Sequence, residues 1–281
     1  MVSQYRIVHT TGYHYEGGAT ASFNEARMTP LTSRRQLVLS SRLDITPVAW
    51  VHSYRDHWGT SAVAFELHER HDEMRGVATS TVDIHEVSRE TEPLGWDDLA
   101  DPALCDEHVE FLTQTTYVAP HPKVAALAAT VRASVATPAE AVVEVVRRLR
   151  ERVSYTPGVT QVHTLASEVW EQGAGVCQDI AHLTLGALRS IGIPARYVSG
   201  YVVQKADPEI GETMVGESHA WIQFFDGEWS GFDPTNQNEP RGSHVEVAVG
   251  RDYSDVAPLK GIYTGSGGSD MFVSVELTRL T

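Results

Sequence analysis

Cysteine is scarce in this chain, with only Cys105 and Cys177 among 281 residues. Two cysteines are too few for the framework of disulfide bridges that holds small secreted proteins together. A hydrophobic content of 42% over this length is instead enough for a core of one large domain or two.

Metal- and cofactor-binding motifs are also missing. The sequence has no C-x-x-C pair, no H-E-x-x-H and no EF-hand loop. His68 and His71 form an H-x-x-H pair, but the pair lies among charges at the end of a predicted strand. The glycines of TGSGGSD, residues 264–270, lack the strand and helix that a phosphate site requires. We therefore expect neither a metal nor a cofactor.

Positive charge is in deficit, with 22 Lys and Arg against 37 Asp and Glu and a formal net charge of −15. This balance argues against nucleic acid or an anionic membrane as the main partner. No apolar run approaches the roughly 20 residues of a membrane span, and the first residues lack the basic-then-apolar pattern of a signal segment. We expect a cytoplasmic protein, because a reducing compartment would keep a thiol active.

Cys177 stands at the start of a predicted helix. The small, flexible run at 173–175 ends one element, and apolar residues then recur at helical spacing as far as Ile191. Gly192 and Pro194 are typical of the end of a helix. In the first turn, unpaired N–H groups and the helix dipole favour a thiolate, and the amide of Cys177 is a natural donor to an oxyanion.

A hairpin is predicted further along the chain. Residues 218–225 and 228–232 read as strands, and Asp226-Gly227 between them is a strong turn signal. The predicted pairing is antiparallel, so opposed residues point to the same face.

The hairpin brings an imidazole near a carboxylate. Centred on the turn, it places His219 opposite Pro234, or opposite Asp233 if the register shifts by one. A carboxylate at this place would orient the ring of His219 and stabilise its cationic form, with the ring facing the thiol of Cys177. Thiol, imidazole and carboxylate in this order are the layout of a cysteine-nucleophile enzyme.

The rest of the chain reads as two patterns joined by a connector. Residues 1–95 are mainly strands separated by turns, which is typical of a β-sandwich-like or barrel-like domain. Residues 96–122 read as an irregular connector. In residues 123–281, helices are followed by strands, and Thr137 to Glu140 form a capping box. We predict an α+β fold.

Four motifs resemble one family. They are GVCQDIAHL around Cys177, LRSIGIPARYVSGY after it, SHAW at His219 and FDPTN at Asp233. The chain resembles the bacterial transglutaminase-like family, whose core has the papain-like cysteine-hydrolase architecture. The resemblance implies Cys177 as the nucleophile, His219 as general base and acid, and Asp233 as the residue that orients His219.

The likeness extends outside the core. Residues 247–265 resemble the family's C-terminal signature, and residues 55–67 resemble its N-terminal domain. Thr60 is a departure, because the family more often has Asn after the glycine. The implied fold is an N-terminal β-sandwich-like domain followed by a papain-like, transglutaminase-like core of helices packed on an antiparallel sheet.

Other residues near the motifs are weaker candidates. Tyr155 is expected by default to pack in the core, with a role as oxyanion donor as the alternative. Gln178 is a further candidate beside the nucleophile, and Asp179 is expected to cap the helix. Cys105 and His182 have no motif of their own, so a structural role is expected for both.

The predicted chemistry is attack of a thiol on the amide carbonyl of a peptide or protein, through a thioester acyl-enzyme. With water as acceptor the protein is a peptidase or amidase, which the resemblance favours. With a primary amine it is a transglutaminase. A non-catalytic binding protein is the third alternative.

Overall fold

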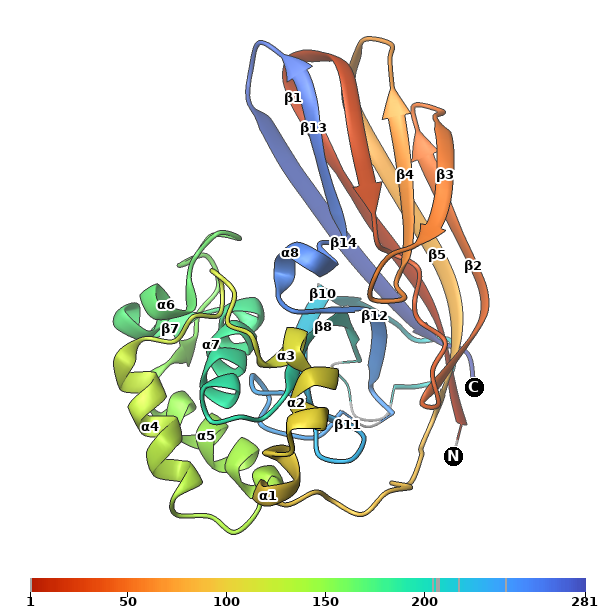
Figure 1. The fold of residues 1–281 in the computed structure, drawn as a ribbon. Coiled ribbons are helices and arrows are strands. Elements are labelled where there is room, and N and C mark those ends of the chain that lie inside the picture. Colours follow the sequence, from red (N-terminus) through yellow and green to blue (C-terminus); the bar gives the residue numbers. More distant parts are fainter. Residues whose placement is uncertain (1, 204, 206–207, 217, 241) are drawn as a thin grey trace.

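The computed structural model describes residues 2–203, 205, 208–216, 218–240 and 242–281. Two large sheets form the framework of the fold, and a group of helices covers one side of the second sheet (Figure 1). Within these residues, no helix is both long and apolar enough to cross a membrane.

The long first strand organises the larger sheet. β1 (Val2–Ala26) pairs with β5 and β14 over its first half and with β4 and β13 over its second half. The register breaks near Gly17 and Gly18, which both have positive φ, so the strand can change layer there. The other strands of this sheet are β2 (Gln36–Thr46), β3 (Trp50–Arg55), β4 (Ser61–Leu67), β5 (His71–His85), β9 (Thr213–Gly216), β13 (Leu259–Gly265) and β14 (Ser269–Arg279).

A hydrophobic core fills the space between the two halves of this sheet. Tyr15 and Met74 from one half and Phe65 and Leu259 from the other are buried in a single cluster. The expected β-sandwich-like domain is therefore found, built from one sheet that folds onto itself.

The second sheet supports the helices. Its antiparallel order is β11 (Trp229–Phe232), β10 (Ser218–Phe225), β8 (Ala195–Val202) and β12 (His244–Gly250). The helices around it are α4 (Pro122–Arg132), α5 (Pro138–Arg152), α6 (Ala166–Gln172), α7 (Cys177–Ser190) and α8 (Tyr253–Val256). The apolar face of α7 is completely buried against α4, α5 and β10, and this cluster is the main core of the protein. The α+β prediction is confirmed.

The two sheets share a third core. Ile7 and Val82 of the first sheet and Tyr201 and Val247 of the second belong to one buried cluster. His9, also buried, adds a hydrogen bond to the hydroxyl of Tyr201 at 2.9 Å.

Three features differ from the sequence predictions. The connector contains three short helices, α1 (Trp96–Leu99), α2 (Pro102–Glu107) and α3 (Val109–Leu112). Asp101 caps α2 by accepting from two backbone N–H groups, and Pro102 follows as its first residue, so this part of the connector is a helix start. In the N-terminal region, strand β3 was not expected.

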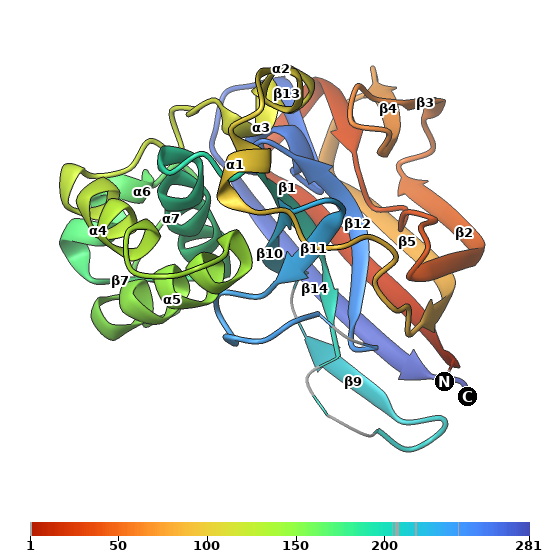
Figure 2. The same cartoon turned by 60° about the horizontal axis from the view of Figure 1, so that its bottom comes forward.

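The third difference concerns the end of the chain. The predicted core of residues 123–281 includes β13 and β14, but their hydrogen bonds are to β1 in the first sheet. β9 joins the same sheet beside β14 (Figure 2). The proposed domain boundaries at 95 and 122 themselves remain predictions.

Candidate active site

Cys177 is the first residue of α7, as the sequence predicted. The helix start is fixed by Asp179, whose Oδ2 accepts the N–H of Val176 at 2.8 Å and the hydroxyl of Thr160 at 2.6 Å. The expected capping role of Asp179 is therefore found. Burial raises the pKa of this carboxyl group, and the two hydrogen bonds oppose that rise.

Gly175 allows this close approach. A Cβ atom added to it would lie 2.8 Å from the Cβ of Asp179, which is closer than side-chain atoms pack. Gly173 ends α6 in the left-handed conformation, with φ of 73°. The two glycines thus let one helix end and the next begin within four residues of Cys177.

His219 and Asp233 meet behind the nucleophile. Nε2 of His219 lies 2.7 Å from Oδ2 of Asp233, and the two side chains are 9% and 0% exposed. Cys177 is close enough to His219 to act, together with Asp233, on the pKa of the imidazole. Because Nε2 is bound to the carboxylate, Nδ1 is the ring nitrogen left for the thiol.

The pairing of the hairpin differs from the predicted register. β10 and β11 are antiparallel as expected, but Phe225 pairs with Trp229 and Ile222 with Phe232. The turn is therefore one residue longer than a two-residue turn at Asp226-Gly227. β11 ends at Phe232, so Asp233 approaches His219 from the turn that follows the strand.

That turn holds Asp233 rigidly. Its Oδ1 accepts the backbone N–H groups of Thr235 and Asn236 at 2.9 and 3.1 Å. Its Oδ2 accepts the side-chain amide of Asn236 at 2.8 Å in addition to His219. The FDPTN motif is thus explained as a loop that turns back on its own aspartate.

The charges of this pair support each other. Burial would lower the pKa of His219, but hydrogen bonds to Asp233 and Cys177 outweigh it and raise the pKa to about 9. Burial would raise the pKa of Asp233, but hydrogen bonds from His219 and His244 hold it far below its usual range. The arrangement therefore favours an imidazolium beside a carboxylate.

Tyr155 lies beside the start of α7. The short parallel strands β6 (Ser154–Tyr155) and β7 (Ala174–Gly175) pair Tyr155 with Gly175. Tyr155 is 44% exposed, so core packing, the default expectation from the sequence, is wrong. Gln178 donates its side-chain amide to the carbonyl of Val162 at 3.0 Å and thereby ties a neighbouring loop to the helix.

The remaining cysteine and histidine candidates have structural contacts. Cys105 bonds the carbonyl of Leu99 within the connector. His182 is fully buried and accepts the backbone N–H of Tyr253. His71 uses both ring nitrogens, on Ser22 and on a backbone carbonyl, and so does not pair with His68 at a metal.

His244 is the site residue that the sequence did not reveal. It begins β12, is buried, and places Nε2 3.1 Å from Oδ2 of Asp233. Its other nitrogen, Nδ1, lies 3.0 Å from the hydroxyl of Ser243. No motif spacing pointed to it, because only the pairing of β12 with β8 brings it to the site.

His219, Asp233 and His244 are also potential metal ligands, since their donor atoms all lie within 4.8 Å of one another. A tetrahedral zinc ion about 2.0–2.1 Å from each ligand would hold ligand atoms about 3.3 Å apart. The His–Asp distances of 2.7 and 3.1 Å are those of hydrogen bonds. The geometry therefore fits two imidazoles bonded to a carboxylate better than a metal centre.

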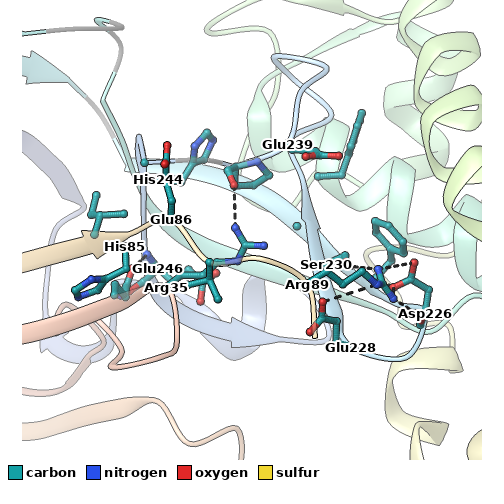
Figure 3. Close-up of a pocket in the computed structure, with 18 of the residues that line it drawn as sticks. Arg35, His85, Glu86, Arg89, Asp226, Glu228, Ser230, Glu239, His244 and Glu246 are labelled. Atoms are coloured by element: carbon teal, nitrogen blue, oxygen red, sulfur yellow. Dashed lines mark hydrogen bonds and ion pairs between the residues drawn. The ribbon is translucent and has the colours of Figure 1, made fainter. Parts of the chain in front are cut away.

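His244 also lines a cavity of about 550 Å³. Its lining comes from both sheets, with Ile84 of β5 from the first sheet and Phe224 of β10 from the second. Arg35, His85 and His244 also line it (Figure 3). Charged side chains line much of it, and Arg89 is paired there with Asp226.

Comparison with known sequences identifies two family regions. The transglutaminase-like superfamily matches residues 125–234, and the bacterial transglutaminase-like N-terminal region matches residues 5–83. The first match includes all three residues of the candidate triad.

Individual relatives agree with these matches. An uncharacterised protein of Mycobacterium leprae is 46% identical over 98% of both chains. A protein-glutamine gamma-glutamyltransferase of Pseudomonas aeruginosa is 30% identical over 150 residues, which are 50% of this chain and 22% of that protein. Among solved structures, a candidate cysteine protease from Cytophaga hutchinsonii superposes with a TM-score of 0.79 at 23% identity. That superposition covers 100% of this chain and 92% of the other, so it shows that the fold is shared.

Proposed function

Since the chain belongs to the transglutaminase-like superfamily, we propose that it is a cysteine-nucleophile amide hydrolase that acts on a peptide or protein. One observation carries the proposal. Nε2 of His219 lies 2.7 Å from the buried carboxylate of Asp233, and Cys177 is near enough to help raise the pKa of the same imidazole. Such a pair activates a thiol by holding it as a thiolate beside an imidazolium.

In the proposed acylation, the sulfur of Cys177 attacks the amide carbonyl. The carbonyl oxygen becomes an oxyanion at the start of α7, where backbone N–H groups, including that of Cys177, point outward. The C–N bond then breaks as the imidazolium of His219 gives its proton to the leaving amine. Asp233 keeps the ring in orientation and stabilises its positive charge.

In the proposed deacylation, water attacks the thioester. Neutral His219 takes a proton from the water, the C–S bond breaks, and the carboxylic acid leaves. Cys177 returns as a thiolate and His219 as an imidazolium, so the cycle closes without a cofactor.

Tyr155 is our proposed second donor to the oxyanion. Its backbone is paired with Gly175, two residues before the nucleophile, and its side chain is partly exposed. A hydroxyl at this position would supplement the amide of Cys177. We give Gln178 a supporting role, because its amide is engaged with Val162.

Acyl transfer to a primary amine is the second candidate function. The Pseudomonas aeruginosa relative carries the name of a protein-glutamine gamma-glutamyltransferase and is 30% identical over half of this chain. The same triad serves both reactions, and they differ only in which acceptor attacks the thioester. The third alternative, a non-catalytic binding protein, is disfavoured because Cys177, His219 and Asp233 are all present and His219 is bonded to Asp233.

Intact-mass spectrometry distinguishes these functions. The protein and its Cys177→Ala variant are mixed with a pool of peptides and a primary-amine probe. Cys177-dependent cleavage, or deamidation with loss of ammonia, supports hydrolysis, whereas Cys177-dependent amine incorporation supports transfer. Identical products with both proteins would contradict the catalytic proposal.

A further inference from the structure

His244 makes a contact that a three-residue mechanism leaves unexplained. Two imidazoles converge on one oxygen, because Oδ2 of Asp233 lies 2.7 Å from Nε2 of His219 and 3.1 Å from Nε2 of His244. The two rings come from different strands, β10 and β12, on either side of β8. Their centroids are 6.0 Å apart.

The hydrogen bonds assign a role to each nitrogen of His244. The carboxylate of Asp233 can only accept, so Nε2 of His244 must carry the proton and donate it. The hydroxyl of Ser243, 3.0 Å from Nδ1, can donate to that nitrogen and so select the tautomer with hydrogen on Nε2. His244 thus donates one hydrogen bond to Asp233 through Nε2.

The surroundings of His244 restrict its movement. The ring packs edge-on against Trp221, with centroids 5.1 Å apart, and Trp221 is fully buried. The His244 side chain is 4% exposed and Asp233 is 0% exposed, while His244 itself lines the cavity of about 550 Å³. His244 therefore contacts the carboxylate and also lines the cavity, whereas Asp233 is not among the residues that line it.

We propose that His244 is a positioning residue that locks Asp233 in the orientation in which it binds His219. The structural part of this inference stands alone, and only the expected effect of His244 on the reaction rests on the proposed function. Without the His244 donor, Oδ2 keeps the amide of Asn236 as its one fixed donor besides His219, and a shorter side chain at 244 leaves space that adjoins the cavity. Water can then compete with His219 for the carboxylate oxygen.

Two amide substitutions test the role with matched chemistry. In His244→Gln, the side-chain N–H₂ reaches about as far as Nε2 and can donate to Asp233. In His244→Asn, the same group sits one carbon shorter, near the position of Nδ1, and cannot reach it. His9→Leu is the control for loss of a buried histidine, because His9 is as buried as His244 and bonds Tyr201, away from the triad.

The primary readout is the NMR resonance of the Nε2 proton of His219, which the bond to Asp233 shields from exchange with water. We expect a downfield resonance in the wild type, His244→Gln and His9→Leu, and its loss by exchange in a folded His244→Asn protein. Persistence of an unchanged resonance in His244→Asn would overturn the proposal. If His244→Asn does not fold, a Ser243→Ala protein gives the second test. Faster exchange of the His219 proton is expected there, and an unchanged rate counts against the proposal.

Alkylation of Cys177 by iodoacetamide at pH 6 is the second readout. A lost hydrogen bond to a charged group predicts a rate reduced about tenfold to a hundredfold in His244→Asn, with most of it restored in His244→Gln. Equal rates in the two variants would contradict positioning through Asp233. The NMR readout does not depend on catalysis. If Cys177 of the wild type is alkylated no faster than an ordinary thiol, the proposed function is contradicted, but the NMR comparison still tests the role of His244.

Discussion

Oδ2 of Asp233 lies 2.7 Å from Nε2 of His219, and neither side chain is more than 9% exposed. The carboxylate is held by a turn that donates two backbone N–H groups and one side-chain amide to it. The ring is therefore held by an acceptor that cannot rotate freely. This rigidity is what a base needs if it is to face the thiol in one orientation.

Asp233→Asn should reduce stability as well as activity. The two carboxylate oxygens of Asp233 accept five hydrogen bonds. An Asn side chain has only one acceptor oxygen, so its N–H₂ group would replace the other oxygen and face hydrogen-bond donors. We expect the free energy of unfolding to fall by about 2–4 kcal/mol, measured by urea denaturation. Asp101→Asn is the control, because Asn also caps a helix. Equal losses in the two variants would contradict the account.

His219 should remain protonated well above neutral pH. Its pKa is raised to about 9 by Asp233 and Cys177 against the effect of burial. By itself this group stabilises the fold fully below about pH 6.5, and that contribution is lost as the pH rises through 9. An NMR titration of the imidazole carbon should show this shift. In Asp233→Ala the pKa should fall, because burial then acts with less opposition. A midpoint near 6.5 in both proteins would count against the ion pair.

Tyr155→Phe should slow the reaction without unfolding the protein. Removal of one oxyanion donor typically costs on the order of a hundredfold in kcat. The side chain is 44% exposed, so the free energy of unfolding should change by less than about 0.5 kcal/mol. Turnover of the peptide identified by mass spectrometry gives the rate, with Ser154→Ala as a neighbouring control. An unchanged kcat would remove Tyr155 from the proposed mechanism.

Gly175→Ala should disturb the nucleophile through its helix cap. The new methyl group would lie 2.8 Å from the Cβ of Asp179, which must move away from the N–H of Val176. Overpacking of this kind costs about 1–3 kcal/mol, and Cys177 should react more slowly with iodoacetamide. Gly76→Ala is the control, because its methyl group would make an ordinary 3.7 Å contact with Leu43. Similar behaviour of the two variants would argue against this role of Gly175.

Local patterns were sufficient to predict the elements that carry the candidate triad. The start of α7 at Cys177 follows from glycines, a capping carboxylate and apolar spacing, and β10 follows from its composition and the turn after it. The capping box from Thr137 to Glu140 was likewise predicted and found. Each of these signals lies within a few residues of the element that it specifies.

Long-range pairing accounts for what was missed. The position of Asp233 depends on a hairpin register that one extra turn residue changes. His244 reaches Asp233 only because β12 pairs with β8, and β14 returns from the end of the chain to pair with β1. Strand order between distant segments is set by the packing of the whole sheet, which periodicity along one segment does not encode.

The most direct test of the central claim is the alkylation rate of Cys177 relative to Cys105 in the same molecule, measured by peptide mass spectrometry at pH 6.5. Few ordinary thiols are ionised at this pH, so only a thiolate held by His219 should react quickly. The account predicts that Cys177 reacts much faster than Cys105 and that His219→Ala removes this advantage. Equal rates for the two cysteines, unchanged by His219→Ala, would contradict the assignment of Cys177 as an activated nucleophile.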